Sequence, residues 1–212
     1  MMRLLIPIAL AVAFTTAASG EDSGQLLTID HFVRVKSTVP AIAGQQAQLY
    51  VRERVLAGMV ARGTTPSDRV VLFVHGAGTP AEVAFDVSSG DYSWMAYLAS
   101  AGFDVFSVDM TGYGRSTRPA PMNDPCNLAE NQRPQFVGAP CTPTYPYALT
   151  NIGSDWNDVG AAVDYIRLLR RVDRVSLVAW SLGGPRAGGY AAENPAKENR
   201  PVILPPAHKP KR

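Results

Sequence analysis

One short stretch constrains the fold of this chain more than any other: a strand-like run, a serine among small residues, and a helix-like segment. The run covers residues 174–179, and Ser181 follows it. A strand, a sharp turn and a helix in this order expose the serine hydroxyl above a sheet and point the positive end of the helix at it. Gly183 suits so tight a turn, in which the positions two before and two after the serine crowd each other, and Ala179 occupies the first of them. A serine in an ordinary strand-to-helix loop is the alternative interpretation.

Two upstream segments favour the first interpretation. Residues 70–74 are wholly apolar and end in His75-Gly76-Ala-Gly, as expected for a strand buried on both faces of a parallel sheet. Residues 103–108 form another such run, which ends at Asp109 and leads into Thr-Gly-Tyr-Gly-Arg-Ser. These three pieces, in this order, resemble the α/β-hydrolase family over about residues 45–204.

The resemblance implies acyl transfer with Ser181 as the nucleophile, on a small-molecule ester, amide or lactone. It further implies an oxyanion hole made by the backbone N–H groups of Leu182 and Ala77, in a loop that His75 and Gly76 hold in place. Epoxide- and haloalkane-cleaving members are disfavoured, because they carry a carboxylate where Ser181 stands. One fold hosts many reactions, so the resemblance leaves the substrate open.

The chain departs from the family pattern after the nucleophile, where a triad acid and then a histidine normally follow. None of residues 182–212 is an aspartate. Glu193 and Glu198 are predicted at the edge of the sheet away from the nucleophile. His208 follows a short apolar strand (202–204) on the correct edge, but Pro205-Pro206 and the basic residues beside it look like a chain terminus. A non-catalytic or truncated α/β-hydrolase-like protein is therefore the alternative to an active serine hydrolase.

Strands that alternate with helices predict an α/β fold, with a doubly wound, mostly parallel sheet that lacks the last strands and helices of the hydrolase architecture. Residues 26–39 and 47–56 are expected to open the sheet as antiparallel strands, and residues 93–101 to form a short helix. Residues 152–170 place apolar side chains at spacings of three and four, which predicts a longer helix. Its charged residues are expected to be solvated or to cap the helix; they are Asp155, Asp158, Arg167, Arg170 and Arg171.

The first twenty residues are interpreted as a secretory signal peptide. Arg3 precedes an apolar stretch at residues 4–14, and small and polar residues follow at 15–20. A membrane anchor is the competing interpretation, although this stretch is shorter than the roughly 20 residues that a span needs. The prediction is a periplasmic or secreted protein with an α/β-hydrolase core at residues 21–204 and a basic tail at 205–212.

Export changes the interpretation of the two cysteines. Cys126 and Cys141 lie in a Pro-rich loop insertion at residues 118–146, and in an oxidising compartment they are expected to form a disulfide. Two free thiols are the alternative, and a metal site is disfavoured because no histidine lies near them in sequence. We expect no metal and no cofactor. The net charge of +2 implies no nucleic-acid partner, and the oligomeric state stays open.

Overall fold

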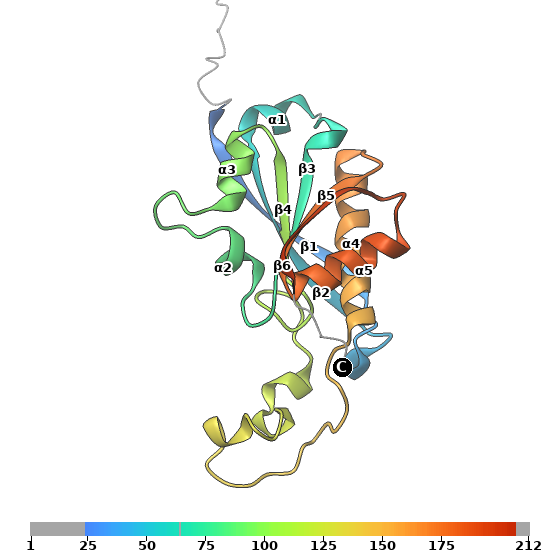
Figure 1. Ribbon diagram of the computed structural model, residues 1–212. Coiled ribbons are helices and arrows are strands. Elements are labelled where there is room, and N and C mark those ends of the chain that lie inside the picture. The colour runs from blue at the N-terminus through green and yellow to red at the C-terminus, as the bar shows by residue number, and fades with distance from the viewer. Residues whose placement is uncertain (1–23, 64, 207–212) are drawn as a thin grey trace, which may run out of the picture.

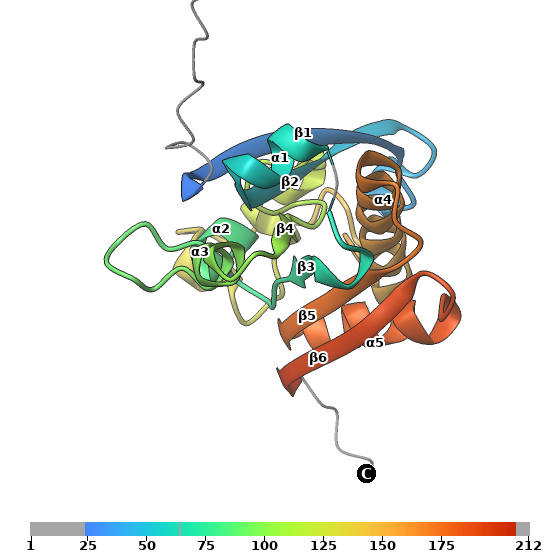
Figure 2. The ribbon, with the colours of Figure 1, turned by 90° about the horizontal axis from the view of Figure 1, so that it is seen from above.

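The computed structural model describes residues 24–63 and 65–206 of the chain. The predicted signal peptide and His208 therefore lie outside the described residues. Six strands form one mixed sheet, and helices lie on both of its faces (Figures 1 and 2). The strands are β1 (Leu26–Lys36), β2 (Gln46–Leu56), β3 (Val70–Val74), β4 (Asp104–Val108), β5 (Val175–Ser181) and β6 (Glu198–Pro206). The helices are α1 (Ala57–Arg62), α2 (Ala81–Phe85), α3 (Trp94–Ser100), α4 (Ile152–Arg170) and α5 (Gly183–Glu193).

The strand order is β1-β2-β4-β3-β5-β6, which confirms the predicted α/β fold class. The long hairpin of β1 and β2 is antiparallel, and β2 also pairs antiparallel with β4. From β4 to β6 all neighbours are parallel. The carboxyl ends of the parallel strands consequently meet at one edge of the sheet, which is where α/β folds place their ligands.

The side chains of β3 alternate between two hydrophobic cores, as a strand buried on both faces requires. Leu72 and Val74 belong to a core that includes residues of α4 and α5. Val71 and Phe73 belong to a smaller core with residues of α2 and α3. Figure 2 shows the two helical layers on opposite sides of the strands.

Two predicted elements agree closely with the structure. Helix α4 has the predicted bounds, and it begins at a capping box in which Asn151 and Ser154 exchange hydrogen bonds. Helix α3 begins at Trp94, and its N-cap is Ser93, whose hydroxyl accepts a hydrogen bond from the Ala96 N–H at 2.8 Å. Strand β6 is longer than the predicted 202–204, since it begins at Glu198 and includes Pro205. An edge strand tolerates prolines, because one side of it makes no ladder hydrogen bonds.

The prediction that the charged residues of α4 are solvated or capping is wrong for three of them. Asp155 and Asp158 are buried at 6% and 3% exposure. Arg170 bridges two fully buried carboxylates from neighbouring strands, with Nε 2.5 Å from Asp104 Oδ2 and a contact from Nη2 to Glu53. Buried charges are expected to be paired in this way, because an unpaired charge in the interior is costly.

Residues 118–150 form a lobe beyond the carboxyl edge of the sheet. This lobe lies at the bottom of Figure 1. The lobe contains only short 3-10 turns, at Ala120–Asn123, Pro125–Asn127 and Arg133–Gln135. Within it a disulfide joins Cys126 to Cys141, with a Cα–Cα distance of 5.7 Å. The predicted disulfide is therefore confirmed, and the lobe lies at the same edge of the sheet as Ser181.

Candidate active site

Ser181 occupies the turn between β5 and α5. It is the last residue of the strand, Leu182 follows, and the helix begins at Gly183. The φ angle of Ser181 is +55°, a left-handed conformation that non-glycine residues adopt rarely and at a cost of about 1–3 kcal/mol. The predicted strand, sharp turn and helix are present, and the serine side chain lies at the apex of the turn.

Two glycines allow backbone to approach this turn closely. A Cβ atom at Gly76 would lie 2.8 Å from Ser181 Cβ and 3.3 Å from its Oγ, so the loop after β3 contacts the serine directly. A Cβ atom at Gly183 would lie 2.2 Å from the Val74 carbonyl oxygen. The closest crowding at Gly183 therefore comes from the end of β3. The fold brings Gly76, Ser181 and Gly183 together.

His75 holds the loop after β3 and is fully buried. Its Nδ1 lies 2.7 Å from the Gly76 carbonyl oxygen, and its Nε2 lies 3.1 Å from the Met110 N–H nitrogen. The carbonyl can only accept, so Nδ1 carries the proton and Nε2 accepts from Met110. Burial lowers the pKa of His75 to about 4. With both ring nitrogens engaged, His75 supports the loop and is unsuited to act as a base for Ser181.

An ion pair that the sequence analysis missed holds the same loop in place. Arg186 of α5 is 3% exposed, and its Nε donates to Asp155 Oδ2 of α4 at 2.8 Å. Its Nη1 lies 3.0 Å from the carbonyl oxygen of His75 and 3.1 Å from that of Gly76. A planar guanidinium with five donors can serve a carboxylate and two carbonyls at once. Arg186 thus ties α4, α5 and the loop beside Ser181 into one unit.

The turn after β4 is a second buried polar element beside this loop. The Asp109 carboxylate accepts hydrogen bonds from the N–H groups of Ala81 and Arg115, at 2.8 and 3.0 Å. A Cβ atom at Gly114 would lie 1.9 Å from Asp109 Oδ2, so only glycine fits there. Asp158 accepts from the Thr111 N–H at 2.8 Å, and burial raises its pKa to about 6. Both carboxylates accept hydrogen bonds from backbone N–H groups, and this explains why they are buried.

The other predicted site residues have the following positions. Ala77 is exposed and directly follows Gly76, and Leu182 is the N-cap of α5. Glu198 pairs with Val175 at the start of β5, which places it at the opposite end of the strand from Ser181. Glu193 is the last of the eleven residues of α5. Among residues 24–63 and 65–206, no hydrogen bond joins Ser181 Oγ to a histidine or a carboxylate.

No group of three or more His, Cys, Asp or Glu side chains in residues 24–63 and 65–206 is arranged to hold a metal ion. In the same ranges no helix combines the length and the apolar character needed to cross a bilayer.

Comparison with known proteins agrees with this geometry. The sequence profile of the alpha/beta hydrolase family matches residues 71–208, whereas no curated protein matches the sequence significantly. Solved structures with a similar fold include a predicted CIB-like hydrolase from Thermoplasma acidophilum, with a TM-score of 0.51, 14% identity, and coverage of 87% of this chain and 65% of that one.

Two plant enzymes are similar to the same degree. Epoxide hydrolase from Vigna radiata gives a TM-score of 0.51 at 18% identity, and the match covers 86% of this chain and 40% of the Vigna radiata chain. Potato (Solanum tuberosum) epoxide hydrolase I gives a TM-score of 0.51 at 22% identity, and the match covers 87% of this chain and 42% of the potato enzyme. This chain thus spans between two fifths and two thirds of the length of these structures. Together, the profile match, the strand order and the turn at Ser181 establish that the chain belongs to the alpha/beta hydrolase family.

Proposed function

We propose that Ser181 is the nucleophile of a serine hydrolase that acts on a small-molecule ester, amide or lactone. The observation that carries this proposal is the conformation of Ser181, which has a positive φ and lies between the end of β5 and the first turn of α5. Strain at a defined residue is characteristic of functional sites, because the surrounding structure must hold it in place. Here the support comes from the contact with Gly76 and the tight packing at Gly183.

The proposed chemistry follows from these positions. The Ser181 hydroxyl attacks the substrate carbonyl, and the oxygen becomes negatively charged in the tetrahedral intermediate. The N–H groups of Leu182 and Ala77 are proposed to bind this oxyanion, with the N-terminus of α5 adding its favourable potential. The base that takes the hydroxyl proton is proposed to be a histidine other than His75, whose two nitrogens are engaged. His208 is the candidate.

The presence of serine at the turn separates this proposal from the chemistry of the two plant epoxide hydrolases. The similarity to those enzymes shows a common fold at 18% and 22% identity. Epoxide opening in this family is expected to use a carboxylate at the position that Ser181 occupies. A hydroxyl nucleophile suits acyl substrates instead.

A second candidate function is a non-catalytic hydrolase-like protein that binds a ligand over the turn without converting it. The observation that favours it is that His75, Arg186, Asp109 and Asp158 all bind backbone or each other. No described acid or base is thus left beside Ser181 to serve a triad.

We also propose that the protein is exported. The Cys126–Cys141 disulfide supports this, because disulfides persist in oxidising compartments. The signal peptide proposed for residues 1–20 is tested by sequencing the N-terminus of the protein recovered from outside the cytoplasm.

Labelling with a fluorophosphonate probe, followed by peptide mapping, tests the role of Ser181. We expect the label on Ser181 and its loss in the Ser181→Ala variant. Ser176→Ala is the matched control, because Ser176 lies on the same strand and is half-buried. Label on another serine while Ser181 stays unmodified would refute the assignment.

A further inference from the structure

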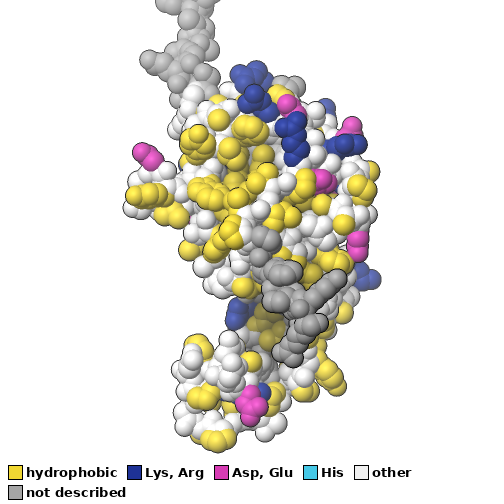
Figure 3. Space-filling model, viewed as in Figure 1, with side chains coloured by type: hydrophobic (Ala, Val, Ile, Leu, Met, Phe, Trp, Pro, Cys, Tyr) yellow, Lys and Arg dark blue, Asp and Glu magenta, His cyan; other side chains and the backbone are white. Residues whose placement is uncertain are grey.

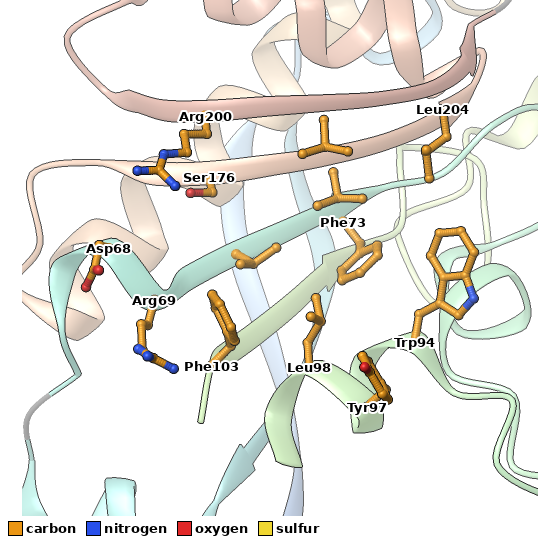
Figure 4. A pocket seen from close by; sticks show the side chains of 13 residues that line it. Asp68, Arg69, Phe73, Trp94, Tyr97, Leu98, Phe103, Ser176, Arg200 and Leu204 are labelled. Carbon is orange, nitrogen blue, oxygen red and sulfur yellow. The ribbon is translucent and has the colours of Figure 1, made fainter. Parts of the chain in front are cut away.

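Arg186 is a buried arginine beside the loop after β3. Arginine side chains usually lie at the surface, as the dark blue groups in Figure 3 do, whereas Arg186 is 3% exposed. Arg69 and Arg200 are surface arginines that line an apolar groove over β3, β5 and β6, on the face of the sheet that carries α3 (Figure 4). Arg186 lies on the opposite face, among α4, α5 and the loop. Burying a charge is costly, so its contacts need an explanation.

The ion pair of Arg186 explains only part of these contacts. Its Nε donates to Asp155 Oδ2 at 2.8 Å, which neutralises the charge. Its Nη1 donates to the carbonyl oxygens of His75 and Gly76, at 3.0 and 3.1 Å. Stability alone does not require this arrangement, because apolar residues of similar volume often replace a buried ion pair without loss of stability. The arrangement does, however, place a rigid donor against two successive peptide groups.

The Gly76 carbonyl is held by two buried side chains. It accepts from His75 Nδ1 at 2.7 Å and from Arg186 Nη1 at 3.1 Å, which uses both lone pairs of the oxygen. The Tyr113 ring packs against both donors, with its centre 4.6 Å from the centre of the His75 ring and 5.4 Å from Arg186 Cζ. The Gly76–Ala77 peptide plane therefore cannot rotate without breaking both hydrogen bonds.

The direction of the Ala77 N–H follows from that of the Gly76 carbonyl. The peptide bond between these residues is trans, so its C=O and N–H bonds lie in one plane and point in opposite directions. With the carbonyl directed at His75 and Arg186, the N–H is directed away from them. Its position is next to the nucleophile, because a Cβ atom at Gly76 would lie 3.3 Å from Ser181 Oγ. Among residues 24–63 and 65–206, neither the Ala77 N–H nor the Leu182 N–H donates to a backbone carbonyl.

We propose that Arg186, oriented by Asp155, is a positioning residue for the oxyanion hole. Through the Gly76 carbonyl it fixes the peptide plane in which the Ala77 N–H faces the oxygen that becomes negative. This inference rests on the proposed function, in which Ser181 is the nucleophile and the N–H groups of Ala77 and Leu182 bind the oxyanion. Donors stabilise a developing charge most when they are already oriented before the reaction, since no reorganisation is then needed.

The amide proton resonances of Ala77 and Leu182 test the proposal in an adduct at Ser181. A fluorophosphonate forms an O–P bond to Ser181 Oγ, and the P–F bond breaks, so that fluoride and the hydroxyl proton leave as HF. The phosphoryl oxygen of the adduct then stands in for the oxyanion. In the wild type both amide protons should shift downfield on labelling, because each gains a strong hydrogen bond to this oxygen.

The variant Arg186→Gln should separate the two amides. We expect the downfield shift of Leu182 to persist and that of Ala77 to be lost. The rate constant for labelling should fall by up to about 100-fold, the effect of losing one such donor. Arg170→Gln is the matched control, because Arg170 also pairs with buried carboxylates, but its partners Glu53 and Asp104 belong to β2 and β4. Both shifts should be retained in this control.

A second variant covers the case in which Arg186→Gln does not fold. Asp155→Leu combined with Arg186→Met removes both charges together, so that no unpaired carboxylate is left in the interior. It should give the same result, a Leu182 shift without an Ala77 shift. The wild-type adduct is a test in itself, since the Ala77 amide must respond in it.

The outcomes separate this proposal from the proposed nucleophile. An Ala77 shift that is unchanged in folded Arg186→Gln would overturn the positioning role, as would a wild-type adduct in which only Leu182 shifts. Loss of both shifts in the variant would overturn it too, because Arg186 would then support the whole turn and not the Gly76–Ala77 peptide. Label on another serine while Ser181 stays unmodified would refute the nucleophile, and the positioning role with it.

Discussion

At the scale of single residues, His75 is the group whose titration the structure constrains most strongly. Its pKa in the folded state is lowered to about 4 by burial, below the 6.5 of an exposed imidazole. The unfolded chain therefore binds the proton first as pH falls. The stabilising effect of neutral His75 is complete above about pH 6.5 and is lost as the pH decreases through about 4.

We accordingly predict that the His75 imidazole stays neutral in the folded protein between pH 8 and about pH 5. The measurement is the ring-proton chemical shift in NMR spectra, with His75→Asn used to assign the resonance. A titration midpoint near 6.5 in folded protein would contradict the burial of His75. Unfolding curves are a poorer test, because the pKa of Asp158 is raised to about 6 and its effect on stability has the opposite sign.

The residues that the sequence located are those whose role is set by local geometry. Ser181 and Gly183 were predicted because a strand-to-helix turn needs small residues at fixed offsets, and Gly76 was predicted from the resemblance to the family. Arg186 and Asp155 were missed because they lie 31 positions apart. Both residue types are usually exposed, and no local pattern indicates that two such side chains will be buried together.

At the scale of elements, prediction succeeded where periodicity and a cap agreed. Helix α4 combines an apolar stripe with the Asn151 capping box, and its bounds were predicted correctly. The short helices α1 and α2 were missed, because five or six residues are too few to show a helical period. Their helical conformation depends on tertiary packing.

The lobe at residues 118–150 is the element for which we expect reduction to have a local effect. The disulfide closes a loop with a sequence separation of 15, which corresponds to about 3 kcal/mol of stabilisation through the unfolded state. No residue of the lobe belongs to either hydrophobic core. Reduction should therefore open the lobe and leave the sheet folded.

Limited proteolysis with and without reductant measures this effect. We expect new cleavages between residues 118 and 150 after reduction, with the rest of the chain still protected. The double variant Cys126→Ser/Cys141→Ser should give the reduced pattern without reductant. Global unfolding on reduction would instead show that the lobe supports the core.

At the scale of the whole molecule, the sheet was predictable because its central strands are recognisable in the sequence as apolar runs. In addition, connections between parallel strands follow few topologies. The residues that line the apolar groove over β3, β5 and β6 were not predicted from the sequence. Residues such as Val178 and Val202 look like core residues in the sequence, and only the arrangement of the helices shows that they line an open face. The pattern of a strand specifies which residues are apolar but not what covers them.

Catalytic turnover is also a property of the whole molecule, since it needs a nucleophile, a base and an acid from separate elements. We predict that residues 1–212 hydrolyse short p-nitrophenyl esters weakly or not at all, because Ser181 has no basic partner among the described residues. Triad members act as a unit, so loss of the base removes most of their combined effect.

The experiment compares the wild type with Ser181→Ala and His208→Ala, after gel filtration has established a folded, monodisperse sample for each. Strong activity that both substitutions abolish would refute the prediction and identify His208 as the base. Strong activity that only Ser181→Ala abolishes would refute it as well, and would place the base elsewhere in the chain. Activity equally low in all three supports the non-catalytic alternative.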